Sequence, residues 1–271
     1  MSAVPTIESA RERERLRTVV VADPKALAYL VADRIVEVVR RQTAAKGGCV
    51  LGLATGHTPL RVYGELIRRC KAGEVSFARV VTFNLDEYWP TTPDSPHSFR
   101  RYMWETLFAH VDIAAANTHI PAGDVPRERL VEACAAYERA IREAGGIDFQ
   151  LLGIGKDGHI GFNEPGSSAD SRTRLVALSP ITRGDAAADF GGVEGVPREA
   201  ITVGVATILE AREVALLATG EHKAEIVRRA VEGDVSPDVA ATFLQRHPNA
   251  TAYLDGAAAS RLTRMRDQRE G

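Results

Sequence analysis

Short apolar runs alternate with amphipathic segments along almost all of this 271-residue chain. The expected strands are Thr18–Ala22, Cys49–Ala54, Arg79–Leu85, Phe149–Ile154, Ala200–Val205, Glu213–Thr219 and Ala250–Asp255. Between most of them apolar residues recur at helical spacing, and the first helix opens with a capping acid and a proline, Asp23 and Pro24. Strands that are apolar throughout belong to sheets covered on both faces. The pattern predicts an α/β fold: a mostly parallel, doubly wound, modified Rossmann-like sheet with helices on both faces.

The chain shows neither an internal repeat nor a long linker. We therefore expect a single domain over residues 18–271, preceded by an N-terminal extension over residues 1–17. The stretch from Lys156 to about Gly195 has little periodicity, and long irregular segments in compact domains are often lids or binding loops. We expect a lid at about residues 162–195.

Composition excludes several classes of partner. The formal net charge is −2, so nothing draws the chain strongly to nucleic acid or to an anionic membrane. No apolar run approaches the roughly 18 residues of a membrane span, and the N-terminus lacks the apolar core of a secretory signal. Three dispersed cysteines without CxxC spacing are typical of a reducing compartment. These features predict a cytoplasmic protein.

Polar, glycine-marked segments follow four of the expected strands. Ligands of open α/β sheets bind outside the carboxyl ends of the strands. The four segments are TGHTPL after Ala54, DEYW after Leu85, GKDGHIGFNEP after Ile154 and TGEHK after Ala218. We expect them to share one site.

Two of these segments suit an anion such as phosphate. Thr55, Gly56 and Thr58 lie between a strand and a helix, where free backbone N–H groups and the helix dipole attract negative charge. The alternative is a plain capped turn, with Thr58 as the N-cap and Pro59 as the first helical residue. Lys223 is expected in the first turn of a helix, where its charge opposes the dipole unless an anion binds; a solvated surface lysine is the alternative.

The other two segments carry acid–base groups. Asp86, at the end of a buried strand, would have a raised pKa suited to abstracting a proton from carbon, unless it only caps a turn. His159 can transfer protons at neutral pH, and Asp157 or Glu164 can orient it. A metal site and a structural polar loop are the alternatives for this segment. Its spacing matches no common metal-binding motif, so we expect no metal.

Seven segments together identify a family resemblance that runs from about Thr18 to Asp255. They are LGLATGHTPL, TFNLDEYW, GIGKDGHIGFNEPGSS, SRTRL, VPREAITVGVATIL, TGEHKAEIVRRAVEG and LQRHPNATAYLD. In order and spacing they resemble the glucosamine-6-phosphate deaminase (isomerase) family. The related 6-phosphogluconolactonases typically read DER and DGHTASLFP, and this chain has neither.

The resemblance implies deamination and isomerisation of D-glucosamine 6-phosphate to D-fructose 6-phosphate in amino-sugar catabolism, with no metal or organic cofactor. Asp86 matches the base that moves a proton between C2 and C1. His159 matches the ring-opening residue, and Asp157 and Glu164 match the acids that orient it. The remaining matched residues, Thr55, Gly56, Thr58 and Lys223, fall at phosphate-binding positions. Family members differ in assembly, so a homo-oligomer is possible.

The chain departs from the family pattern in three places. Ala187–Phe190 stands where many members carry a phosphate-binding arginine, and Arg183 is the candidate replacement. In regulated members a serine, an arginine and a lysine bind an acetylated amino-sugar phosphate at a second site. Ser167 and Arg174 are retained, but Val176 replaces the lysine, so we expect weak or absent activation. His57 stands where relatives often have glycine or serine.

Two other functions stay open at this point. A lactonase acting on a phosphorylated sugar lactone would share the fold but release no ammonia. A non-catalytic regulator that binds a sugar phosphate would need an attached DNA-binding helix-turn-helix. The segment before Thr18 is too short to form one.

Overall fold

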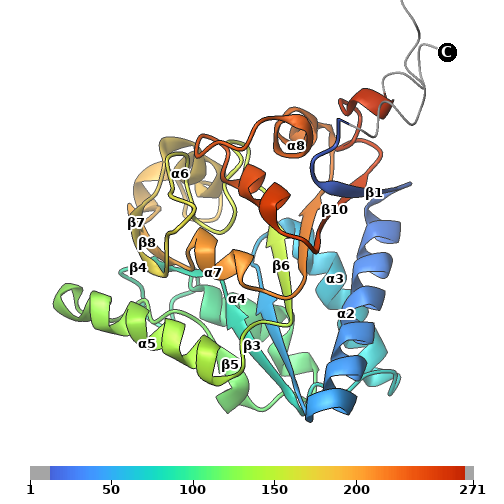
Figure 1. Ribbon diagram of the computed structural model, residues 1–271. Coiled ribbons are helices and arrows are strands. Elements are labelled where there is room, and N and C mark those ends of the chain that lie inside the picture. Colours follow the sequence, from blue (N-terminus) through green and yellow to red (C-terminus); the bar gives the residue numbers. More distant parts are fainter. Residues whose placement is uncertain (1–12, 266–271) are drawn as a thin grey trace, which may run out of the picture.

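Seven parallel strands form the central sheet of the computed structural model, which describes residues 13–265 (Figure 1). Their order is β1-β10-β9-β6-β2-β3-β5. The strands are β1 (Arg17–Val21), β2 (Cys49–Leu53), β3 (Val80–Asn84), β5 (Thr118–His119), β6 (Phe149–Gly153), β9 (Val214–Ala218) and β10 (Ala250–Asp255). Every pairing in this sheet is parallel. The prediction of a mostly parallel sheet is confirmed.

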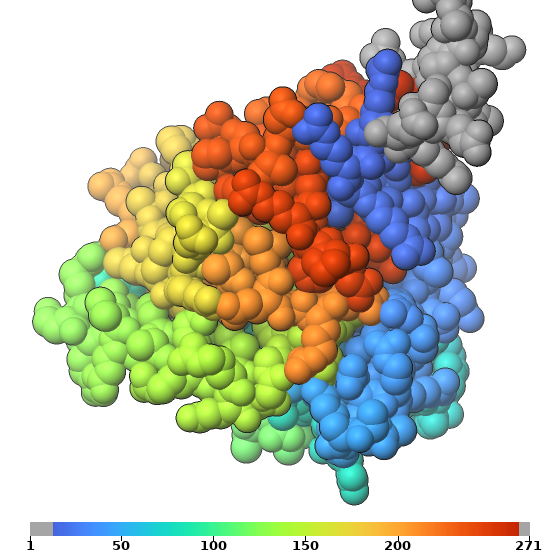
Figure 2. Space-filling model, in the orientation of Figure 1, coloured from blue at the N-terminus to red at the C-terminus, as the bar shows by residue number. Residues whose placement is uncertain are grey.

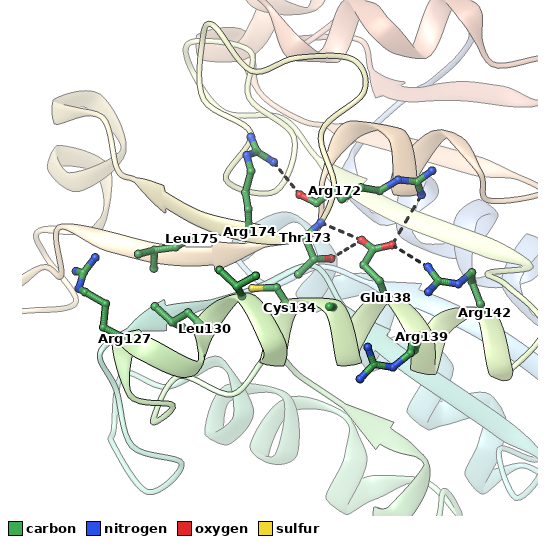
Figure 3. Close-up of a pocket in the computed structure, with 12 residues that line it drawn as sticks. Arg127, Leu130, Cys134, Glu138, Arg139, Arg142, Arg172, Thr173, Arg174 and Leu175 are labelled. Atoms are coloured by element: carbon green, nitrogen blue, oxygen red, sulfur yellow. Dashed lines mark hydrogen bonds and ion pairs between the residues drawn. The ribbon is translucent and has the colours of Figure 1, made fainter.

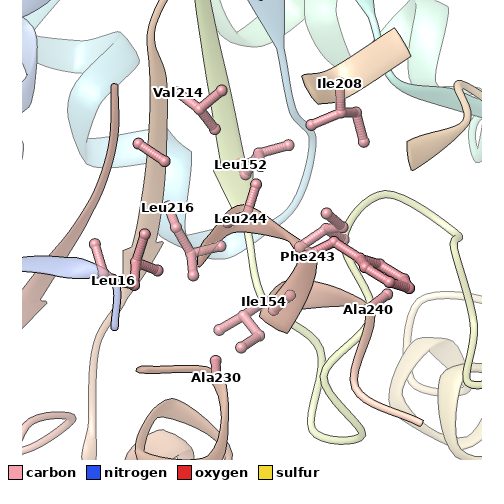
Figure 4. Packing of buried hydrophobic residues seen from close by; sticks show 14 of the residues in the cluster. Leu16, Leu152, Ile154, Ile208, Val214, Leu216, Ala230, Ala240, Phe243 and Leu244 are labelled. Atoms are coloured by element: carbon pink, nitrogen blue, oxygen red, sulfur yellow. The ribbon is translucent and has the colours of Figure 1, made fainter. Parts of the chain in front are cut away.

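Helices cover both faces of the sheet, because successive residues of each buried strand point to opposite sides. Leu51, for example, packs with α2 (Pro24–Lys46), α3 (His57–Lys71) and α4 (Phe99–Thr106). Its neighbour Val50 belongs to the opposite core. That core is completed by the end of α5 (Leu130–Glu143), by α7 (Val205–Leu209), by α8 (Ala224–Glu232) and by the 3₁₀ helix η6 (Ala240–Arg246). Figure 4 shows part of this second core, where Leu152, Leu216 and Leu244 meet.

The first helix begins as its sequence predicts. The carboxylate of Asp23 accepts hydrogen bonds of 2.8 Å from the backbone N–H groups of Lys25 and Ala26, and Pro24 is the first helical residue. The helix ends at Gly47, whose φ of 85° lies in the left-handed region.

A second, antiparallel sheet corrects one expectation. It has the order β4 (Asp86–Trp89), β8 (Glu199–Thr202), β7 (Arg174–Ala177). The apolar run at Ala200–Val205 was expected in the main sheet, but its strand β8 pairs with β4 instead. Apolar periodicity reports that both faces of a strand are buried, and it does not report which sheet contains the strand.

The segment expected as a lid contains regular structure: β7, α6 (Pro180–Ala186) and the 3₁₀ turn η4 (Val193–Gly195). The remaining 3₁₀ helices are η1 (Phe108–His110), η2 (Ala115–Asn117), η3 (Arg127–Arg129) and η5 (Glu221–Lys223).

Most of the expected N-terminal extension, residues 1–12, lies outside the described residues. Its last part belongs to the fold, since Leu16 is buried and β1 begins at Arg17. Strand β1 pairs with β10, so segments from the two ends of the chain lie side by side on the surface (Figure 2). Within residues 13–265, no helix combines the length and the apolarity needed to cross a bilayer.

Candidate active site

The segments that follow β2, β3, β6 and β9 line one cavity of about 410 Å³ at the carboxyl edge of the main sheet. Of the residues expected in the site, Thr55, Gly56, Thr58, Asp86, His159 and Lys223 line it. Asp157 and Glu164 lie behind His159 and contact its ring. The structure therefore brings all the expected site residues together.

The loop between β2 and α3 and the first turn of α3 line this cavity, and the first N–H groups of a helix have no partner within it. Gly56 has a φ of 99°, which a residue with a side chain rarely adopts, and it precedes the first helical residue, His57. Within residues 13–265, no side chain caps this helix. The hydroxyl groups of Tyr63 and Tyr102 donate to the carbonyls of Ala54 and Gly56, at 2.5 and 2.6 Å. These two hydrogen bonds hold carbonyl groups of the loop, and the N–H groups at the start of the helix suit an anion.

The alternative of a turn capped by Thr58 is wrong. Because Gly56 can adopt a positive φ, the helix begins one residue before Thr58, and Pro59 is its third residue. Thr58 is therefore free to face the cavity with the first turn of the helix.

Lys223 supplies positive charge at the same end of the cavity. It is the last residue of the turn η5, immediately before α8, rather than within the first turn of the helix as expected. Its ammonium group donates to the carbonyl of Ile154 at 2.8 Å. Burial lowers the pKa of Lys223. Lys223 is therefore fixed by a hydrogen bond and partly removed from water, so the alternative of a solvated surface lysine is wrong.

Asp86 is a buried carboxyl group with little to stabilise its charge. It is 5% exposed at the start of β4. Burial first, and then the negative charge of Glu87, raise its pKa to about 7, although the positive charge of His159 lowers it. Glu87 instead has a structural task, because it accepts hydrogen bonds from the backbone N–H groups of Phe99 and Arg100 at the start of α4. Asp86 has the proton affinity of a base that works near neutral pH.

His159 points one ring nitrogen at two carboxylates. Its Nδ1 lies 2.7 Å from Oδ1 of Asp157 and 3.6 Å from Oε2 of Glu164. Burial lowers the pKa of His159, but the hydrogen bonds and charges of these two acids outweigh burial and raise the pKa to about 9. The same hydrogen bond holds the pKa of Asp157 below its usual range, against the opposing effect of burial. With Nδ1 committed to Asp157, Nε2 is the nitrogen left for a ligand.

Glycine is required beside this imidazole. A Cβ atom at Gly155 would lie 2.2 Å from Cε1 of His159, so any other residue would displace the ring. The glycines of this segment thus make room for the ring as well as allowing its turns.

The same three side chains are also the one group of metal-ligand type found among residues 13–265. Ligand atoms of Asp157, His159 and Glu164 all lie within 4.8 Å of one another. However, the 2.7 Å separation of Nδ1 and Oδ1 is that of a charge-assisted hydrogen bond. Two ligands of one metal ion, each about 2.1 Å from it, are usually about 3 Å or more apart. The arrangement favours an acid–base pair.

The expected lid segment packs against this acid–base group. Ser179, the N-cap of α6, donates its backbone N–H to Glu164 at 3.1 Å, and its hydroxyl lies 3.4 Å from Oδ2 of Asp157. Thr182 on α6 lines the cavity with its hydroxyl 3.4 Å from Nδ1 of His159. Sequence reasoning missed Ser179 and Thr182, since serine and threonine near a helix start ordinarily indicate only a cap.

The candidate replacement arginine lies elsewhere. Arg183 donates to the backbone carbonyls of Val193 and Val196, at 2.7 and 3.3 Å, and it is not among the residues that line the cavity. His57 and His222 do line it.

A larger cavity, about 850 Å³, lies between α5 and β7 (Figure 3). Its buried carboxylate, Glu138, accepts hydrogen bonds from the backbone and hydroxyl groups of Thr173 and from the hydroxyl of Thr207. These bonds join α5, the residue before β7, and α7, so Glu138 has a structural role. Arg174 lines the same cavity and donates to Ser167 at 3.1 Å. Among the described residues that line this second cavity, none forms an acid–base pair like that of Asp157 and His159.

Comparison with known sequences links the chain to one family. The family model described as glucosamine-6-phosphate isomerases/6-phosphogluconolactonase matches residues 22–253. A protein of Rhodopirellula baltica named glucosamine-6-phosphate deaminase is 51% identical over 243 residues, which are 90% of this chain and 94% of that relative. Glucosamine-6-phosphate deaminase 2 of Bacillus subtilis is 48% identical over 227 residues, 83% of this chain and 90% of the relative.

Solved structures give the same grouping. A monomeric glucosamine-6-phosphate deaminase matches with a TM-score of 0.86 at 38% identity, covering 90% of this chain and 99% of that one. A 6-phosphogluconolactonase from Thermotoga maritima matches with a TM-score of 0.69 at 25% identity, covering 88% and 98%. The chain is therefore more similar to that deaminase than to that lactonase, both in sequence and in fold.

Proposed function

Because the chain belongs to the family of glucosamine-6-phosphate isomerases and 6-phosphogluconolactonases, we propose that it converts D-glucosamine 6-phosphate and water into D-fructose 6-phosphate and ammonia. One observation carries the proposal: a single cavity contains two separate proton-transfer groups and an anion site. Asp86 lies on one side and His159, with its two carboxylates, on another, while the loop at Gly56 and Lys223 supply positive potential.

The phosphate binds at the end of the cavity formed by Thr55–Thr58 and Lys223. The N–H groups at the start of α3 donate to the phosphate oxygens, and the hydroxyl groups of Thr55 and Thr58 are within the same lining. The ammonium group of Lys223 adds a full charge. Anchoring the substrate at C6 directs the opposite end of the sugar, C1 and C2, toward the proton-transfer groups.

His159 opens the sugar ring. In the free protein its raised pKa keeps the imidazole protonated at neutral pH, with one N–H bonded to Asp157 and Nε2–H directed to the cavity. The imidazolium can donate a proton to the ring oxygen as the bond between C1 and that oxygen breaks. It recovers a proton from the hydroxyl on C1, which becomes the aldehyde. Asp157 and Glu164 orient the ring throughout and stabilise its charge.

Asp86 then moves one proton between adjacent carbons. Its carboxylate takes the proton from C2 and returns it to C1. In the same conversion the oxygen on C1 gains a proton and the nitrogen on C2 loses one, so the aldehyde becomes a C1 alcohol and the amine becomes an imine at C2. A pKa near 7 makes the carboxylate a stronger base than an exposed aspartate while still leaving it substantially ionised at neutral pH. Water adds to the imine carbon, and ammonia leaves. The products are the C2 ketone, D-fructose 6-phosphate, and ammonia.

A panel of phosphorylated substrates tests this proposal. Ammonia and ketose phosphate should appear in equal amounts with glucosamine 6-phosphate. Mannosamine and galactosamine 6-phosphates, which differ at one carbon, show how strictly the cavity selects configuration. Release of ammonia from none of the three would contradict the proposal.

The second candidate, hydrolysis of a phosphorylated sugar lactone, rests on the shared fold and family description. A lactonase produces acid and no ammonia, so measuring both products from the same preparation separates the two reactions. We favour the deaminase because its relatives match at higher identity over most of the chain.

We also propose that the protein acts in the cytoplasm in amino-sugar catabolism. The three cysteines are free in the structure, two of them buried, as suits a reducing compartment.

A further inference from the structure

Positive charge is scarce in the cavity that holds Asp86 and His159. Among its described lining residues, only Lys156 and Lys223 carry the permanent charge of a lysine or arginine. A phosphate monoester has between one and two negative charges at neutral pH, and its three oxygens can accept from several donors. Lys223 already gives one of its N–H bonds to the carbonyl of Ile154. Lys223 alone therefore leaves part of the phosphate's negative charge without a partner, and a second cation at this end of the cavity would pair with it.

Lys156 is held at that end by a weak and exposed partner. Its Nζ lies 2.5 Å from Oδ1 of Asp185, and both residues line the cavity. Their side chains are 53% and 38% exposed. Ion pairs this exposed contribute little to stability, because water competes for both partners. The lysine can exchange its partner at small cost.

Lys156 and Asp185 are both close enough to Lys223 to act on its charge. Burial is the main cause that lowers the pKa of Lys223; Lys156 lowers it further and Asp185 raises it. Lys156 comes from the loop after β6, whereas Asp185 comes from α6. The two lysines thus approach one region of the cavity from different elements.

We propose that Lys156 is a second ligand of the substrate's phosphate, and that it exchanges Asp185 for the phosphate when the substrate binds. The proposal rests on the proposed function, since it assigns a further residue to the same site. Without ligand, Asp185 neutralises the ammonium group and holds it at the rim. With ligand, the phosphate replaces the carboxylate, and the carboxylate then repels the bound anion.

This exchange predicts opposite effects for the two partners. Removing the charge of Lys156 removes a phosphate ligand, so binding weakens. Removing the charge of Asp185 removes a competitor, so binding stays equal or tightens. The alternative is a structural tether: the pair fixes α6, which carries Thr182 beside His159. A tether predicts that loss of either partner has the same effect.

The test is calorimetric binding of inorganic phosphate to the full-length protein at low salt. The variants are Lys156→Gln and Asp185→Asn. The control for Lys156→Gln is Lys71→Gln, which removes one positive charge in the same way. Lys71 is exposed at the far end of α3, about 20 Å from the first turn of that helix.

We expect Lys156→Gln to weaken phosphate binding by about tenfold, as loss of a charge-assisted hydrogen bond would. Asp185→Asn should bind at least as tightly as the native protein, and Lys71→Gln should stay within about twofold of it. With glucosamine 6-phosphate the same ranking should appear in KM more than in kcat. The proposal is overturned if Lys156→Gln binds phosphate like the control, or if both variants of the pair lose affinity equally. Calorimetry needs no turnover, so a failed ammonia assay of the native protein would be recognised separately.

Discussion

Replacing Asp157 by asparagine should return the imidazole of His159 to a neutral form at physiological pH. In the native protein, burial lowers the pKa of His159, but Asp157 and Glu164 together raise it from 6.5 to about 9. That difference corresponds to roughly 3 kcal/mol in favour of the imidazolium. In the variant, burial persists, and the remaining carboxylate oxygen is 3.6 Å from Nδ1. We therefore expect the pKa of His159 to fall to about 7 or below.

The difference in unfolding free energy between the native protein and Asp157→Asn should be larger at low pH than at high pH. A pKa that is raised by folding contributes stability that is fully present below the unfolded value of 6.5 and lost as pH rises through about 9. The native protein should therefore exceed Asp157→Asn in free energy of unfolding by up to roughly 3 kcal/mol at pH 6, and by much less at pH 10.

Two assays measure these effects. Proton NMR titration of the His159 ring gives its pKa, and urea unfolding at pH 6 and pH 10 gives the two free energies. Asp94→Asn is the control, because Asp94 is an exposed acid. The reasoning is refuted if His159 still titrates near 9 in Asp157→Asn, or if the difference in unfolding free energy is the same at both pH values.

Three further predictions follow from the site. The value of kcat/KM should rise as pH passes through about 7, where Asp86 loses its proton, and fall above about 9, where His159 loses its own; a single-limbed profile between pH 5 and 10 would contradict these roles. Prolonged treatment with a chelator should leave the ammonia rate unchanged, because the pair of His159 and Asp157 has hydrogen-bond spacing, whereas a loss restored by a divalent metal would favour a metal site. Rate against substrate concentration should be hyperbolic and insensitive to N-acetylglucosamine 6-phosphate, because the aliphatic side chain of Val176 cannot pair with a phosphate; sigmoidal kinetics relieved by that compound would show that activation survives.

The main sheet could be predicted from sequence because its signal is strong. Strands such as Cys49–Leu53 are buried along their whole length, and a fully apolar run between helices permits few other arrangements. The small sheet could not be predicted in this way. Strand β8 is buried at three of its four residues, yet it pairs with Asp86–Trp89, and only the three-dimensional path of the chain brings those two strands together.

The family was predicted correctly from the seven segments, and the comparisons confirm it. The titratable groups could be chosen from sequence because each follows a strand at the same sheet edge. The roles proposed for Lys156 and Asp185 could not, since an exposed charged residue usually indicates only a solvated surface. The helix start at His57, with Gly56 as the N-cap, was also missed, because an N-cap threonine is the commoner signal in sequence.

The central claim is that Asp86 transfers the proton on carbon while separate groups bind the phosphate. The most direct measurement compares the native protein with Asp86→Asn, scoring ammonia and fructose 6-phosphate release from glucosamine 6-phosphate beside calorimetric binding of inorganic phosphate. We predict equal amounts of both products from the native protein. The variant should be slower by roughly 10²–10⁴-fold and should bind phosphate as the native protein does. A variant that retains near-native kcat would contradict the account.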